Sequence, residues 1–103
     1  MKIIRDSTPD IYIVDAEADA VVLEASVWAG ASVQVPGALT INVYGCNYED
    51  PRNRTFVQCY DVDGVAKSIV AAAAGLFDLP PIHSIKWIKL VGTETEVALN
   101  RAG

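Results

Sequence analysis

The stretch from Leu39 to Gly92 decides the fold, and it closes with Ile85-Lys86-Trp87-Ile88-Lys89-Leu90-Val91-Gly92. Apolar residues recur at alternate positions in its strand-like segments, and polar, turn-rich residues separate those segments. Alternation with a period of two indicates a half-buried strand. The closing segment is partly apolar on both faces, which favours a central strand. The stretch therefore predicts a small β-sandwich.

The same alternation continues outside this stretch. Turn signals separate the apolar segments, among them Pro36-Gly37 and Asp61-Val62-Asp63-Gly64. The segments expected to form strands are 11–14, 20–28, 32–35, 39–44, 55–60, 84–91 and 95–99, with a turn at 15–19 and a tail at 100–103. Together with the segment around residue 70 they make about eight strands. We therefore predict one all-β domain over residues 1–103, a two-sheet sandwich or jelly roll.

The segment from Val65 to Gly75 is ambiguous between strand and helix. Asp63 could cap a helix, and the four alanines that end at Ala74 favour one. Against this, Ser68-Ile69-Val70 is β-branched at its centre and the segment lies between strands. We expect strand or extended chain here; the alternative is an α+β fold with one helix at Val65 to Gly75.

Composition limits the partners. Hydrophobic residues make up 51% of the chain and charged residues 20%, with a net charge of −5. Only eight Lys and Arg are present, which argues against direct binding of nucleic acid. We expect no membrane span, because no apolar run approaches about 18 residues, and no signal peptide, because the amino terminus lacks an apolar core. The apolar surplus predicts contact with other protein chains and a homo-oligomer.

The cysteines and acidic residues do not predict a metal site. Cys46 and Cys59 are expected to be reduced thiols, because nothing indicates a secreted protein. With His83 they provide too few ligands at tight spacing. The alternating carboxylates at Asp15-x-Glu17-x-Asp19 lack the glycine and distal glutamate of a calcium loop. We predict a solvated acidic turn.

No catalytic motif occurs. His83, Ser84 and an aspartate could nominally form a triad, but no strained turn presents the serine beside an oxyanion hole. The seven glycines are isolated, so they form no phosphate loop. We predict a protein that is not an enzyme and needs no cofactor.

The polar loop from Gly45 to Arg54 holds the candidate binding residues. Tyr48, Arg52 and Arg54 belong to types enriched at protein interfaces, where aromatics supply area and Arg supplies several donors. Loops of this kind lie on the surface and carry function. We predict these three residues as partner contacts, whereas Trp28 and Trp87 are expected in the core.

Five segments carry a resemblance to known families. They are Val43-Tyr44-Gly45-Cys46-Asn47, Thr55-Phe56-Val57-Gln58, Asp61-Val62-Asp63-Gly64, Leu79-Pro80 and Ile85 to Val91. In this order they resemble discoidin-like jelly rolls and, more closely, small tailed-phage virion proteins. The resemblance covers half of the chain. The phage proteins usually have a simple turn in the loop where this chain inserts residues 48–53.

The resemblance implies a non-enzymatic protein with a structural role in a virion. It would be a capsid decoration or cement protein, or a head-associated accessory, assembled in the host cytoplasm. Its partners would be copies of itself or the major capsid protein. The alternative is a discoidin-like module that binds a carbohydrate or a host surface through its end loops, with Tyr48 as a contact.

Overall fold

The protein is all-β, as the alternation predicts. The structure, a computed structural model, describes residues 3–4, 11–26, 29–82 and 84–102. No helix occurs in these residues, so none of them forms a helix that could cross a membrane. The strands are β1 Ile3–Ile4, β2 Ile11–Val14, β3 Val22–Glu24, β4 Gly30–Val35, β5 Leu39–Cys46, β6 Val57–Gln58, β7 Ser68–Ala71, β8 Gly75–Asp78, β9 Trp87–Val91 and β10 Thr95–Ala102.

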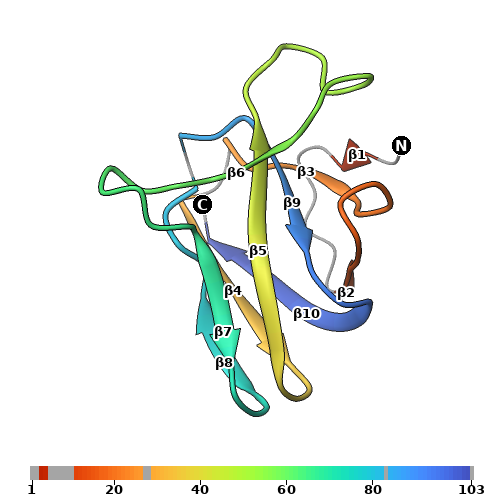
Figure 1. The fold of residues 1–103 in the computed structure, drawn as a ribbon. Helices are drawn as coiled ribbons and strands as arrows, with labels where there is room; N and C mark the ends of the chain where they lie inside the picture. Colours follow the sequence, from red (N-terminus) through yellow and green to blue (C-terminus); the bar gives the residue numbers. More distant parts are fainter. Residues whose placement is uncertain (1–2, 5–10, 27–28, 83, 103) are drawn as a thin grey trace.

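Two sheets pack face to face as a small β-sandwich (Figure 1). The first, sheet A, has the order β1-β3-β9-β5-β6, and β7 also pairs with β5. The second, sheet B, has the order β2-β10-β4-β8. The pairs are antiparallel except for the parallel pair of β1 and β3. The central position of β9, between β3 and β5, confirms the prediction from its two apolar faces.

The main core lies between the sheets and is built by strand alternation. In β2, for example, Tyr12 and Val14 point inward while Ile11 and Ile13 are exposed. Burying an aliphatic side chain of this kind stabilises the fold by about 1.5–3 kcal/mol. The fully buried aliphatic residues of this core include Val14, Leu23, Val33, Ile41, Val43, Ile88 and Leu90.

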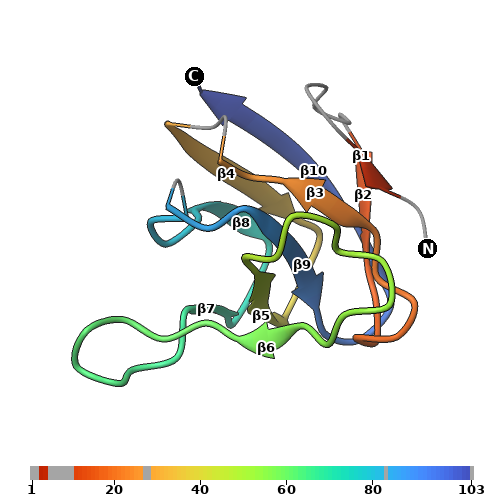
Figure 2. The ribbon, with the colours of Figure 1, turned by 90° about the horizontal axis from the view of Figure 1, so that it is seen from above.

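A second, smaller core lies on the other face of sheet A. It consists of Val22, Cys46, Phe56 and Trp87, with Tyr44 packed against it. The 47–56 loop leaves the end of β5 and returns into β6 (Figure 2), and its Phe56 is part of this cluster. Strand β9 is therefore buried on both faces. Trp87 lies in the core as predicted; Trp28 lies outside the described residues.

The segment around residue 70 forms two strands and no helix. β7 pairs with β5 in sheet A, and β8 pairs with β4 in sheet B. The tight turn at 72–74 therefore carries the chain from one sheet to the other. Strand or extended chain is confirmed here, and the helix alternative is wrong, because pairing with two different sheets overrides the helix propensity of the alanines.

Several boundaries differ from the sequence-based predictions. β3 and β6 are shorter than predicted, and the pair β1–β3 was not foreseen. β6 is short because the chain turns away from β5 after Cys59. The backbone N of Val43 in β5 then donates to Lys67 O, just before β7, and no longer to the β6 segment. The expected tail at 100–103 is wrong, since β10 runs to Ala102 by pairing with β4.

Candidate functional site

The 47–56 loop brings two of the three predicted contact residues together. Tyr48 is exposed, and Arg54 Cζ lies 4.1 Å from the centroid of its ring, a cation–π contact. Arg52 is exposed in the same loop, and its backbone N donates to Asp50 Oδ1 at 2.9 Å. Tyr48 and Arg54 therefore form one surface unit, with Arg52 on the connecting turn.

The inner side of the loop is anchored to β9 and to the residue before it. Trp87 Nε1 donates to Tyr48 O at 2.9 Å, and Lys86 N donates to Asn47 Oδ1 at 2.9 Å. Lys86 Nζ also lies 3.6 Å from Glu49 Oε2. The inserted residues thus cover the buried indole as well as presenting Tyr48, a structural role that the polar composition of the loop does not reveal.

A buried lysine lies close to the same small core. Lys89 is 3% exposed, and its Nζ donates to Glu17 O at 2.8 Å and lies 3.3 Å from Glu17 Oε1. The Nζ is also 4.5 Å from the centroid of the Phe56 ring. These contacts satisfy the buried charge, which would otherwise be costly. The acidic turn was predicted to be solvated. Asp19 is exposed, whereas Glu17 is only partly exposed and supplies the partner of this lysine.

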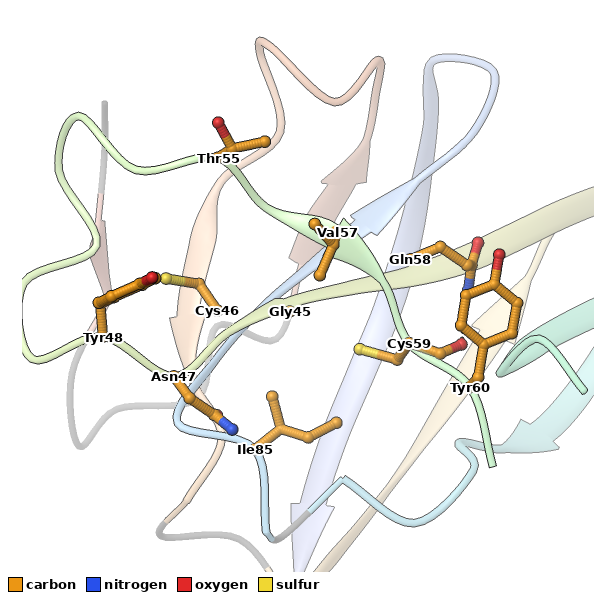
Figure 3. Close-up of a pocket in the computed structure, with 10 residues that line it drawn as sticks. All are labelled: Gly45, Cys46, Asn47, Tyr48, Thr55, Val57, Gln58, Cys59, Tyr60 and Ile85. Atoms are coloured by element: carbon orange, nitrogen blue, oxygen red, sulfur yellow. The ribbon is translucent and has the colours of Figure 1, made fainter. Parts of the chain in front are cut away.

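A pocket of about 380 Å³ opens between the loop and strands β5 and β6 (Figure 3). Its lining residues are Gly45, Cys46, Asn47, Tyr48, Thr55, Val57, Gln58, Cys59, Tyr60 and Ile85. Gly45 keeps the chain close here, because a Cβ at this position would lie 2.8 Å from both Cys59 Sγ and Ile85 Cγ2. Val57, Cys59 and Ile85 make much of the lining apolar.

Two polar side chains of the pocket, Asn47 and Gln58, already make hydrogen bonds within the protein. Gln58 Nε2 lies within hydrogen-bond distance of the carbonyl oxygens of Val43, Cys59 and Lys67 at 3.0, 2.9 and 3.2 Å. Burial raises the pKa of the Cys59 thiol, and the charge of Lys67 offsets part of this rise. A protonated thiol is a poor nucleophile. The pocket therefore offers apolar shape more than chemistry.

The second surface feature, which the sequence-based predictions did not include, is the 59–67 arm between β6 and β7. The arm projects from the sandwich in both views (Figures 1 and 2). It carries three exposed apolar side chains, Tyr60, Val62 and Val65. The turn at Asp61-Val62-Asp63-Gly64 was predicted from the sequence. The apolar residues in and next to this turn could also have predicted a contact surface.

Internal hydrogen bonds hold the arm in one shape. Tyr60 and Ala66 form an isolated β-bridge, and Asp61 N donates to Val65 O at 2.9 Å. Asp61 Oδ1 accepts from Asp63 N at 2.8 Å and from Val65 N at 2.9 Å. The arm is thus a preformed hairpin and not a loose loop.

The described residues form no cluster suited to a metal. Within them, no group of three or more His, Cys, Asp or Glu side chains is placed to hold an ion. His83, the nominal base of the triad considered above, lies outside the described residues.

The chain was compared with known protein families, curated proteins and solved structures. No protein family, curated protein or solved structure matches the chain. The fold and the surface define a small β-sandwich with an anchored loop and a projecting arm.

Proposed function

We propose that this protein is a non-enzymatic structural protein that acts by contact with other protein chains. Specifically, we propose a virion accessory: a capsid decoration or cement protein, or a head-associated component. The observation that carries the proposal is the gathering of exposed Tyr60, Val62 and Val65 on one projecting, hydrogen-bonded arm. The resemblance of segments 43–47, 55–58, 61–64, 79–80 and 85–91 to tailed-phage proteins supports the virion assignment.

The arm has the physical properties of a contact element. Single exposed apolar residues are common on protein surfaces, but a cluster on one segment marks an interaction site. Because the hairpin is preformed, binding costs less conformational entropy than ordering a loop would. Tyr60 supplies the kind of aromatic side chain that anchors interfaces. The exposed Asp61 and Asp63 at the tip favour a partner with an apolar surface bordered by cationic groups.

The proposal is tested by sedimenting the protein with capsids assembled without it. We expect the wild type to co-sediment and the double variant Val62→Ser, Val65→Ser to bind at least tenfold more weakly, a loss of about 1.4 kcal/mol. The matched control Ile11→Ser, Ile13→Ser removes exposed apolar groups from β2 and should leave binding unchanged. Failure of the wild type to bind any capsid would contradict the virion assignment.

The predicted loop residues are tested in the same assay. Alanine at Tyr48, Arg52 and Arg54 together should weaken capsid binding if the loop shares the interface. The fold should survive, because the Tyr48 carbonyl that accepts from Trp87 remains. Unchanged binding by this variant would confine the contact to the arm.

The alternative function is a discoidin-like module for a carbohydrate or host surface. Its supporting observation is the pocket with two exposed tyrosines, Tyr48 and Tyr60, in its lining. The apolar lining and the engaged amide of Gln58 weigh against recognition of a sugar, which needs free polar groups. Specific glycan binding that is lost in both Tyr48→Ala and Tyr60→Ala would favour this alternative.

A further inference from the structure

One pocket lies between the two surface elements that the proposed function uses. The 47–56 loop contributes Tyr48 to the lining of the pocket of about 380 Å³, and the base of the 59–67 arm contributes Tyr60 (Figure 3). Tyr48 is 58% exposed and Tyr60 is 59% exposed, so both rings are accessible to a partner. A partner that contacts the loop and the arm together would therefore lie across this pocket.

The pocket is preformed by backbone pairing. Gly45 on β5 pairs with Val57 on β6, and Lys86 N, just before β9, donates to Asn47 Oδ1 at 2.9 Å. These contacts fix the two strands and the start of the loop that surround the pocket. Its volume lies within the range of about 300–1,000 Å³ that is common for ligand pockets. Walls that are fixed before binding reduce the entropic cost of association.

The lining favours an uncharged occupant. Of the described residues that line the pocket, none is Asp, Glu, Lys or Arg, although these types make up 20% of the chain. Burying an unpaired charge in such surroundings is costly. Burial also raises the pKa of the Cys59 thiol, so this group stays protonated at neutral pH. The pocket therefore suits a neutral apolar group and disfavours a phosphate, a carboxylate or an ammonium group.

The exposure of the lining favours a side chain of a protein over a free small molecule. Besides the two tyrosines, Val57 is 61% exposed. A binding pocket typically buries about 70–90% of the surface of a small ligand. A small molecule here would stay open to water on the side where these three residues are exposed. A partner protein that inserts a side chain also brings the surrounding surface that covers them.

The charges on the two sides of the pocket define the partner further. On the loop side, Arg54 Cζ lies 4.1 Å from the centroid of the Tyr48 ring. On the arm side, Asp61, directly after Tyr60, and Asp63 are exposed. Complementary charges steer association and fix the orientation of the partner. We therefore expect a basic group of the partner beside the arm and an acidic group beside Arg54.

We propose that this pocket receives one large, uncharged apolar side chain of the partner protein, flanked in that protein by a basic group and an acidic group. Such a side chain would anchor the interface, because the strongest contacts of an interface are usually central side chains packed in a pocket. The inference rests on the proposed function, contact with other protein chains, and deepens it by assigning what the partner inserts.

An NMR titration with blocked amino acids tests the pocket without capsids. We expect N-acetyl-L-leucinamide and N-acetyl-L-tryptophanamide to shift the amide signals of Val57, Cys59 and Ile85, with dissociation constants of about 1–10 mM. The charged N-acetyl-L-lysinamide should shift none of them. Val57→Asp should weaken binding at least tenfold, because its carboxylate would lose water to an apolar group. Val70→Asp is the matched control: Val70 is 72% exposed on β7, which also pairs with β5, and it lies outside the lining.

Thiol labelling of the wild type on capsids supplies a second readout that needs no variant. N-ethylmaleimide should modify Cys59 at least tenfold more slowly in the bound protein than in the free protein, because the inserted side chain covers its Sγ. Cys46 is 6% exposed and serves as the buried reference in both states. Circular dichroism verifies that both aspartate variants keep the fold.

Several results would overturn the proposal. They are no shifts from the leucine and tryptophan derivatives, equal shifts from the lysine derivative, and unchanged binding of these derivatives by Val57→Asp. Micromolar binding of indole alone would assign the pocket to a free small molecule and would overturn the partner side chain as its occupant.

The outcomes separate this inference from the proposed function. A wild type that binds capsids through Val62 and Val65 while Cys59 reacts as fast as in the free protein would refute the pocket and leave the proposed function standing. A protein whose pocket takes the neutral derivatives but which binds no capsid would refute the virion assignment and leave the pocket standing.

Discussion

At the scale of single residues, Tyr12 joins the two sheets. Its ring is buried in β2 of sheet B, and its hydroxyl donates to Val21 O at 2.6 Å and accepts from Leu90 N at 3.2 Å, both on the side of sheet A. Burial raises the pKa of Tyr12 to about 12; the hydrogen bond from Leu90 lowers it in part and Asp15 raises it further. The neutral phenol is therefore the form that the fold requires.

We expect Tyr12→Phe to lower the free energy of unfolding by about 1–3 kcal/mol at neutral pH, because it leaves the Val21 carbonyl and the Leu90 amide without this partner. The pH dependence has a definite sign. The phenol has a pKa near 10 when unfolded and about 12 when folded. Its stabilisation is complete below roughly pH 10 and is lost as the pH rises through 12.

Denaturant unfolding at a series of alkaline pH values measures this effect. The wild type should lose stability between about pH 10 and 12, and Tyr12→Phe should lose less over the same interval. The phenolate absorbance of the variant should also lack the component with its midpoint near pH 12. Equal stability and equal alkaline decline in the two proteins would show that the hydroxyl does not bridge the sheets.

At the scale of elements, the 59–67 arm depends on its turn. Gly64 has a φ of +80°, a region that residues with a Cβ rarely adopt. Gly64 N donates to Asp61 O at 3.0 Å, and this bond closes the turn. The glycine therefore determines whether the arm keeps the shape in which Val62 and Val65 are presented.

Gly64→Ala should destabilise the arm by about 1–2 kcal/mol through the unfavourable backbone conformation. Because the arm is exposed, we expect faster hydrogen exchange and proteolysis at residues 60–66 with little change in the thermal midpoint of the whole domain. Gly37→Ala is the control, since a Cβ there meets nothing within 4 Å and no positive φ applies. An arm equally protected in both variants would contradict the requirement for Gly64.

At the scale of the whole molecule, the tertiary structure separates the two cysteines. Cys46 packs in the small core with Trp87, whereas Cys59 packs against the core between the sheets. Gly45 is paired with Val57, and Cys59 N donates to Val43 O at 2.9 Å. Cys59 therefore lies opposite Val43, which is three residues before Cys46 on β5. The side chains of Cys46 and Cys59 lie on opposite faces of sheet A.

Both thiols should be free. Three residues along a strand separate the positions by about 10 Å, beyond the 4.4–6.8 Å between Cα atoms that a disulfide usually allows. Thiol titration of the denatured protein without reductant should find two reactive groups, the same number as after reduction. An intramolecular bridge detected by mass spectrometry would contradict the β5–β6 register.

The candidate site could be predicted only in part. Polar, turn-rich composition located the loop that carries Tyr48 and Arg54, because such composition excludes a buried strand. The same composition did not reveal that this loop covers Trp87, since residues 48 and 87 meet only after β5 and β9 pair. The 59–67 arm was recognised as a turn, but the exposure of Val62 follows from its projection beyond both sheets.

The sequence by itself determined the all-β class, the position of most strands and the turns between them, because period-two alternation and turn residues act over a few neighbours. Only the tertiary structure decided that the alanine turn crosses from sheet A to sheet B, that Glu17 is the partner of buried Lys89, and that the two cysteines face different cores. Each of these depends on which strands pair and in which register. That choice is set by packing between residues far apart in the chain, which no local pattern encodes.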